Sequence, residues 1–194
     1  RAGAPAEILY TYKPHVGTDI LRQVVKNIRQ TIINQGGEVR FNNKVTDFII
    51  TGHRLIGVTI NDIENLAAEV VILAIGHSAR DTFARLLERG VHLRPKPFSI
   101  GLRIEHPQQL INQVQFKEFA NHPRLGAADY KLSYHSPTGR SAYTFCMCPG
   151  GFVVAAASEK GGVVTNGMSN YAREAENANS ALLVGVKPED FGGS

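Results

Sequence analysis

The sequence lacks the glycine pattern with which proteins commonly hold a dinucleotide. None of its 19 glycines is separated from another by a single residue, so Gly-x-Gly-x-x-Gly does not occur. That pattern lets the backbone turn tightly against a diphosphate and points the N-terminus of a helix at it. P-loop, His-Glu-x-x-His and Cys-x-x-Cys patterns are missing as well. A dinucleotide would therefore lack its usual anchor in this chain.

Long apolar runs, cysteines and clustered charge are also scarce. The longest apolar runs hold six residues, far fewer than the roughly 20 of a membrane helix, so we expect no membrane contact. Two cysteines cannot form a disulfide framework, and no Asn-x-Ser/Thr acceptor occurs, which favours the reducing cytoplasm. The 21 Lys and Arg residues are scattered among 17 Asp and Glu, a pattern that does not favour a nucleic-acid partner. Because the chain begins with Arg1 and has no signal-like apolar core there, we expect that upstream sequence has been removed.

The first half of the chain predicts helices, a meander and one buried strand. Apolar residues at helical spacing indicate an amphipathic helix over about 19–35, with Thr18 or Asp19 as its cap and Gly36 at its end. A short strand at 38–41 and three antiparallel strands between 45 and 68 follow. Val70–Ile75 is apolar at every position, which is typical of a parallel strand covered on both faces. Ser78 is the expected cap of a helix over 79–89.

The second half predicts a mostly β structure. Strand-like runs cover about 98–104, 131–135, 142–148 and 152–158, with a helical insertion over 107–120. The predicted fold class is α/β plus β: an incomplete α/β portion joined to a sheet-rich domain. We divide the chain into a lead-in loop, the α/β portion, the sheet-rich domain, and a return segment with a truncated end: residues 1–17, 18–95, 96–165 and 166–194.

Two groups of residues are candidates for chemistry. Cys146 and Cys148 are one residue apart, so on a regular strand they would share a face before the Gly150-Gly151 turn. They are either small buried hydrophobes or thiols that face a redox cofactor, and two thiols alone do not predict a metal site. Lys13 and His15 lie in the loop before a helix N-terminus, which suits either an anionic group or a solvated turn.

Five longer motifs resemble a known family, and they occur in the same order along nearly the whole chain. The family is that of the uncharacterised NAD(FAD)-utilising or FAD-dependent dehydrogenases, within the glutathione-reductase type of flavoproteins with two dinucleotide-binding domains. The motifs are Lys13–Asp19, Ala74–Asp81, Ile100–Pro107, Phe145–Gly151 and Thr165–Ser169.

The resemblance implies which residues approach the cofactor. Val45 would pair its backbone with adenine, and Gly76, with Ala74 in support, would lie beside the ADP half of FAD. The sheet-rich half would be an inserted substrate domain that covers the flavin. Its flavin-facing loops would carry Gly150, Gly151, Asn166 and Met168.

The function implied by the resemblance is that of a FAD-dependent oxidoreductase, and this chain would be an internal fragment of it. FAD is the expected cofactor, NAD(P) is a further candidate, and the partners are a small-molecule substrate and the rest of the parent chain. We expect the fragment alone to be inactive. The alternatives are a flavoprotein module that modifies nucleic acid and a non-catalytic folding or interaction unit.

The missing diphosphate loop leads to a binding prediction. The 194-residue chain should be colourless after purification, and its affinity for the adenylate portion of FAD should be weak, about millimolar on ordinary affinity arithmetic. Titration with FAD, followed by flavin fluorescence, measures this affinity. Tight stoichiometric binding would show that the cofactor site has been misplaced.

Overall fold

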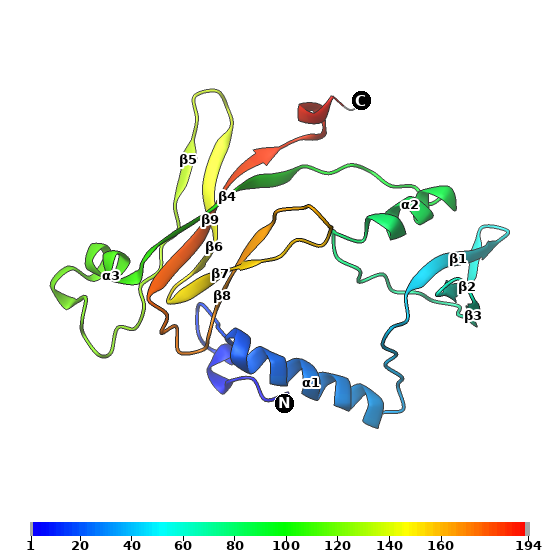
Figure 1. Ribbon diagram of the computed structural model, residues 1–194, viewed down its shortest axis with the longest axis horizontal. Coiled ribbons are helices and arrows are strands. Elements are labelled where there is room, and N and C mark those ends of the chain that lie inside the picture. Colours follow the sequence, from blue (N-terminus) through cyan, green and yellow to red (C-terminus); the bar gives the residue numbers. More distant parts are fainter. Residues whose placement is uncertain (1, 193–194) are drawn as a thin grey trace. The chain divides into compact units, whose positions relative to one another are not determined.

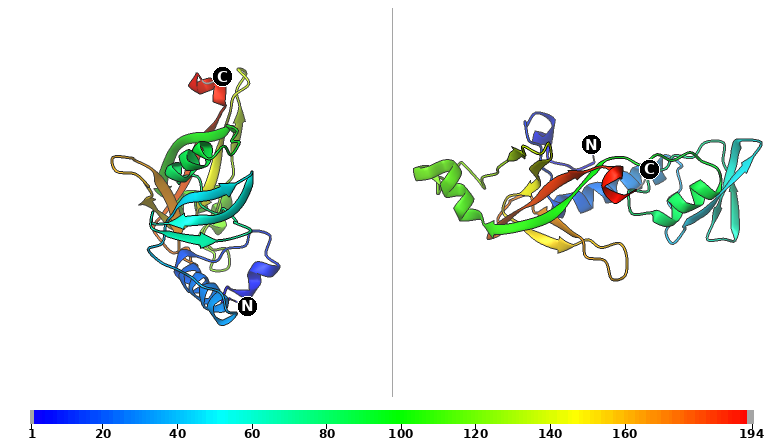
Figure 2. Two further views of the ribbon diagram at one scale, coloured as in Figure 1. Left: turned by 90° about the vertical axis from the view of Figure 1, so that its right-hand side faces the viewer. Right: turned by 90° about the horizontal axis from the view of Figure 1, so that it is seen from above.

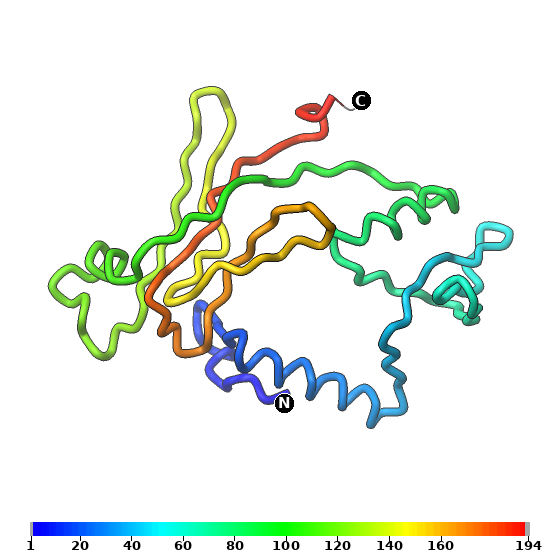
Figure 3. The backbone as a smooth tube through the Cα atoms, viewed as in Figure 1, coloured from blue at the N-terminus to red at the C-terminus, as the bar shows by residue number. Residues whose placement is uncertain are grey.

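The computed structural model describes residues 2–192 (Figure 1). The chain forms two compact units, one made of Arg1–Gly37 with Lys96–Ser194 and the other of Glu38–Pro95. We call them the sheet unit and the meander unit. The backbone can be followed through each in Figures 2 and 3. Helices are mixed with strands that pair in antiparallel fashion, in three separate sheets.

The meander unit contains the three antiparallel strands that the sequence predicts. They are β1 (Val45–Thr51), β2 (Arg54–Ile60) and β3 (Glu64–Ala67), in the order β1-β2-β3, followed by the helix α2 (Arg80–Glu88). Alternating residues of β1 and β2 point to one face, where Phe48, Val58 and Ile60 form a small core with Leu86 of α2. The unit is therefore held together by packing of one helix on one face of the meander.

Two strands predicted for this unit are wrong. Residues 38–41 and the run Val70–Ile75 lie outside any strand. Val70 and Ile72 are 79% and 88% exposed, so the run is not buried. A parallel strand needs hydrogen-bonded neighbours and cover on both faces, and none of the described strands pairs with this segment.

The predicted helix caps are also wrong, although the helices themselves are confirmed. The helix α1 (Thr18–Asn34) starts after Gly17, and α2 starts after Ala79; neither start has a side-chain cap. Instead, Thr18 Oγ1 donates to the carbonyl of Ser169 at 3.1 Å, and Asp19 Oδ1 accepts from the backbone of Tyr171 at 2.9 Å. The side chains of Thr18 and Asp19 thus connect the start of α1 to Ser169 and Tyr171, and they are engaged there instead of with the N–H groups of their own helix.

The sheet unit is built on a four-stranded antiparallel sheet. Its order is β4 (Phe98–Pro107), β9 (Asn177–Val186), β6 (Ser141–Cys148) and β5 (Ser133–His135). A second, two-stranded sheet consists of β7 (Gly151–Ala155) and β8 (Thr165–Ser169), and the remaining elements are α3 (Gln108–Phe116) and the 3-10 turns η1 (Ala6–Leu9), η2 (Lys117–Phe119) and η3 (Pro188–Phe191). The hairpin contacts the larger sheet, with β7 against β9 and β8 against β6.

The strand β9 lies between β4 and β6, although it comes last in the chain. The segment 166–194, expected as a return segment, thus supplies an inner strand of the main sheet. Its burial explains the small residues at its start, where Ala178, Asn179 and Ser180 are almost fully covered. No described helix is long and apolar enough to cross a membrane.

An ion pair between Asp47 and Arg89 predicts how the meander unit responds to acid. Nε of Arg89 donates to Oδ1 of Asp47 at 2.7 Å, and this guanidinium lowers the pKa of Asp47 from 3.8 to about 2. Because the pKa is lower in the folded state, the ionised pair stabilises the fold above about pH 4, and this contribution is lost as the pH falls toward 2.

Replacing Asp47 by Asn should therefore lower the free energy of unfolding by about 1 kcal/mol near neutral pH, since both side chains are partly solvated. The same variant should lose less stability than the wild type between about pH 4 and pH 2. Denaturant unfolding at several pH values measures both effects, and Glu69→Gln, at an exposed carboxyl in the same unit, is the control. An unchanged acid response in Asp47→Asn would contradict the assignment.

Candidate functional site

The two cysteines lie at the end of β6, but they do not share a face. The pairing of β6 with β9 shifts between Phe145 and Cys148, and Cys146 has a φ of +49°. Such a bulge inserts an unpaired residue and breaks the alternation of a regular strand. Cys146 is exposed and Cys148 is buried, with Sγ of Cys148 3.4 Å from the carbonyl oxygen of Cys146. The expectation that both thiols share one strand face is therefore wrong, while a contact of either thiol with a redox cofactor stays a prediction.

The turn after Cys148 is held by a hydrogen bond to the Gln108 side chain and by the backbone conformation of Gly150. The amide of Gly150 donates to Oε1 of the buried Gln108 at 2.7 Å, and Nε2 of Gln108 donates to the carbonyl of Ala128 at 3.0 Å. Gly150 has a φ of +47°, and a Cβ there would overlap the carbonyl of Arg173. Only glycine fits this position, so the predicted Gly150-Gly151 turn is a rigid start for β7.

Three side chains from different strands meet beside Gly167. A Cβ on Gly167 would overlap Oδ1 of Asn179 and Nη1 of Arg103, and it would lie 2.9 Å from Sγ of Cys148. Nη1 of Arg103 donates to Oδ1 of Asn179 at 2.7 Å and lies 3.4 Å from the Cys146 carbonyl oxygen. We call Arg103, Cys148, Gly167 and Asn179 the Gly167 cluster.

The Gly167 cluster contains buried donors without acceptors. Among the described residues, neither Nε of Arg103 nor Nδ2 of Asn179 has a hydrogen-bond partner, and Asn179 is fully buried. Burial raises the pKa of the Cys148 thiol, the neighbouring Cys146 raises it further, and Arg103 opposes the shift. Cys148 is therefore mainly a neutral thiol near pH 7.

The structure brings most of the predicted flavin-facing residues to this cluster. Gly151 pairs with Ser169, and Met168 lies across the hairpin, where its carbonyl would meet a Cβ on Gly151. Asn166 is exposed and accepts the amide of Gly167 at 2.8 Å. Whether they contact a flavin stays a prediction. The contribution of Arg103 and Asn179 was missed, because their contact depends on the pairing of β4 with β9, and β9 was not recognised as a strand.

Lys13 and His15 have partners elsewhere in the sheet unit. Nζ of Lys13 lies 2.6 Å from Oδ2 of Asp129, so its charge is matched. Nε2 of His15 donates to the carbonyl of Asn170 at 3.0 Å, and its ring stacks on Tyr171. These contacts tie the loop before α1 to the segment after β8 and do not join the Gly167 cluster.

Val45, Ala74 and Gly76 lie in the meander unit, where Val45 lines a small pocket of about 180 Å³. An ion pair between Lys44 and Asp81 stands at this pocket. Ala74 and Gly76 are exposed, and Gly76 has a φ of +69° with no atom within 4 Å of an added Cβ. The space beside Gly76 is thus open, whereas its role toward the ADP half of FAD stays a prediction.

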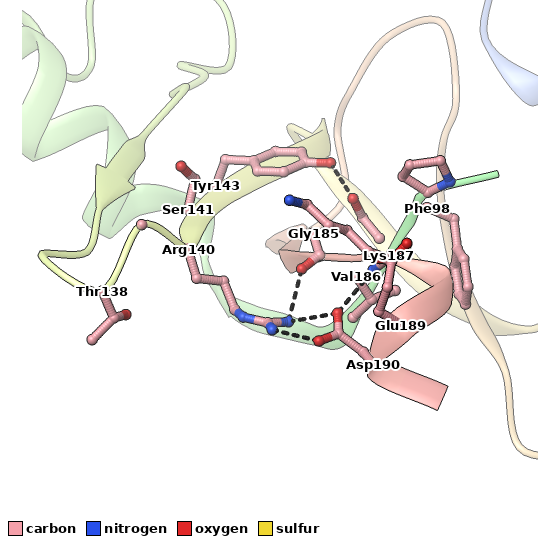
Figure 4. A pocket seen from close by; sticks show the side chains of 13 residues that line it. Phe98, Thr138, Arg140, Ser141, Tyr143, Gly185, Val186, Lys187, Glu189 and Asp190 are labelled. Atoms are coloured by element: carbon pink, nitrogen blue, oxygen red, sulfur yellow. Dashed lines mark hydrogen bonds and ion pairs between the residues drawn. The ribbon is translucent and has the colours of Figure 1, made fainter. Parts of the chain in front are cut away.

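A pocket of about 820 Å³ in the sheet unit contains none of the predicted site residues (Figure 4). The Arg140 guanidinium points across it to Asp190, at 2.8 Å, and to the carbonyl of Gly185, at 3.1 Å. Ser99 and Tyr143, which also line this pocket, share a hydrogen bond of 2.6 Å. Arg140 is thus paired with Asp190, while Lys187 and Glu189 also line this pocket.

Comparison with known proteins identifies the family of the chain. A family model described as FAD-dependent protein, C-terminal domain-like, matches residues 97–194, and the chain belongs to this family. A protein of Clostridium beijerinckii, described as uncharacterized, is 55% identical over 195 residues. The alignment covers 100% of this chain and 36% of that relative, so the chain spans about a third of the relative's length.

The different environments of the two thiols predict different reactivity. In the native chain, Ellman's reagent should modify Cys146 rapidly and Cys148 slowly, because the thiolate is the reactive form and burial raises the pKa of Cys148. Cys146→Ser should remove the fast phase, and Cys148→Ser should remove the slow one. Equal rates for the two single variants would contradict the placement of Cys148.

Proposed function

We propose that this member of the FAD-dependent protein family is part of a longer FAD-dependent oxidoreductase. In this proposal, the meander unit contributes to the site for the ADP half of the cofactor, and the sheet unit covers the flavin and the substrate. The observation that carries the proposal is the exposed run that ends at Gly76. It combines four exposed apolar side chains, at Val70, Ile72, Leu73 and Ile75, with a glycine backbone that leaves room for close approach.

The exposed apolar run is suited to packing against a cofactor-binding domain in a longer protein. Burying apolar side chains contributes about 25 cal/mol per Å², so leaving Val70, Ile72, Leu73 and Ile75 in water forgoes a substantial stabilisation. Neighbouring strands from the rest of a longer protein would pair with this segment and recover that free energy. The left-handed backbone of Gly76 would then end the strand beside the ADP half of FAD, where a side chain would obstruct contact.

The buried hydrogen-bond donors of the sheet unit support its proposed place beside the flavin. Nε of Arg103 and Nδ2 of Asn179 need acceptors, and a flavin or an oxygen-bearing substrate carries acceptors. FAD would supply hydride or electron transfer, while these residues would orient the reacting groups and exclude water. NAD(P) would serve as electron partner in this scheme.

The complete parent protein provides the test. It should purify with bound FAD and show flavin absorption, and Gly76→Val should weaken FAD binding by about tenfold or more, which corresponds to about 1.4 kcal/mol. The matched control is Gly52→Val, because Gly52 also has a positive φ (+56°) and no atom within 4 Å of an added Cβ. The control separates backbone strain from obstruction of the cofactor.

A colourless parent protein that does not bind added FAD would contradict the proposed function. Equal FAD affinities for the Gly76→Val and Gly52→Val variants would contradict the role of Gly76. Both are read from equilibrium titration, with thermal unfolding as the check that each variant is folded.

A further inference from the structure

Arg103 differs from four other arginines of the chain because no described carboxylate forms an ion pair with it. Arg40, Arg85, Arg89 and Arg140 each form an ion pair with an Asp or Glu side chain. No described acidic residue pairs with Arg103, and its hydrogen bonds engage Nη1 alone. A partly buried guanidinium without a counter-ion carries a desolvation cost that an anionic ligand would offset.

A groove of about 600 Å³ runs past Arg103 in the sheet unit. Its walls are mostly apolar and come from β4, β9 and the loop that leads into β8: Gly101, Leu102, Val163, Val164, Ala181 and Leu183. The hairpin that carries this loop lies beside the main sheet in Figure 1, in agreement with the contact between β7 and β9. A groove of this size with apolar walls and few polar groups is typical of a small-molecule site.

Strand pairing explains why the groove reaches the guanidinium. Gly101 pairs with Leu183 and Arg103 pairs with Ala181, so these four residues lie on the same face of the sheet. The small side chain of Ala181 leaves room next to Arg103, whereas Gly101 lets the backbone of β9 approach closely, because a Cβ there would overlap the carbonyl of Leu182. Asn179, two residues from Ala181 on the same face, holds Nη1 through its Oδ1.

We propose that this groove binds a small organic acid with an apolar body, whose carboxylate is held by Arg103. Asn179 acts as a positioning residue, since it fixes the guanidinium from within the sheet. The apolar body lies along Val164, Ala181 and Leu183. A carboxylate supplies acceptors where the cluster has an excess of donors, and its bonds to a guanidinium are charge-assisted.

This inference deepens the proposed function, on which it rests only in treating the ligand as the substrate of the oxidoreductase. Acid binding itself requires neither FAD nor the rest of the parent protein. If the parent lacks FAD but the groove binds the acid, the proposed function fails and the site stands. If the parent holds FAD but the groove does not bind the acid, only the site fails.

The probes are octanoate and its uncharged analogue octanamide, titrated into the full 194-residue chain and followed by ligand-observed NMR. We expect octanoate to bind at least tenfold more tightly than octanamide, because only octanoate pairs with the cation. Arg103→Gln should weaken octanoate binding at least tenfold, and Arg103→Lys should restore part of it. Arg124→Gln, which removes an exposed positive charge from the same unit, should leave the affinity unchanged.

A second variant keeps the cation and tests the geometry. Asn179→Asp places a carboxylate against Arg103 within the protein, so it should also weaken octanoate binding at least tenfold while the chain remains folded by circular dichroism. Equal affinity for octanoate and octanamide would overturn the proposal. So would unchanged octanoate binding in a folded Arg103→Gln or Asn179→Asp variant.

Discussion

The hydrogen bond from Nη1 of Arg103 to Oδ1 of Asn179 joins β4 to β9 at the centre of the sheet unit. It lies directly beneath Gly167, whose missing side chain lets β8 approach both residues and Cys148. A larger residue at 167 would push the hairpin away from the sheet, since close-packed interiors absorb extra volume poorly. The close approach of the hairpin to this hydrogen bond and to Cys148 therefore depends on the absence of a side chain at Gly167.

Two features of the structure are unfavourable in the chain by itself: exposed apolar side chains in one unit and buried donors without acceptors in the other. The meander unit leaves an apolar run in water between Val70 and Ile75. The sheet unit buries polar donors without acceptors, at Arg103 and Asn179. Both features are costly in an isolated chain. Each becomes favourable if a further part of a FAD-dependent protein covers the first and a ligand with acceptor atoms meets the second.

Local patterns predicted the helices, the meander and most strands of the sheet unit, because residue spacing and glycine ends determine these elements. Helix α1 ends before Gly36, whose φ is +85°. The sequence did not reveal the inner position of β9 or the bulge at Cys146, since both depend on pairing between distant residues. At Val70–Ile75 the sequence predicted an element that does not form. Its composition suits a buried strand, but no described strand pairs with it. Lys13 was a reasonable anion candidate until Asp129, far away in sequence, proved to be its partner.

In the proposed function, the exposed run and Gly76 meet the cofactor in the complete protein. Hydrogen–deuterium exchange of the parent protein, with and without FAD, tests it directly, because it reports protection of each backbone segment. We predict that FAD slows exchange at 70–76 and near Val45, while the β1–β2 turn at Gly52 keeps its rate. Protection that is confined to segments outside these residues would contradict the account.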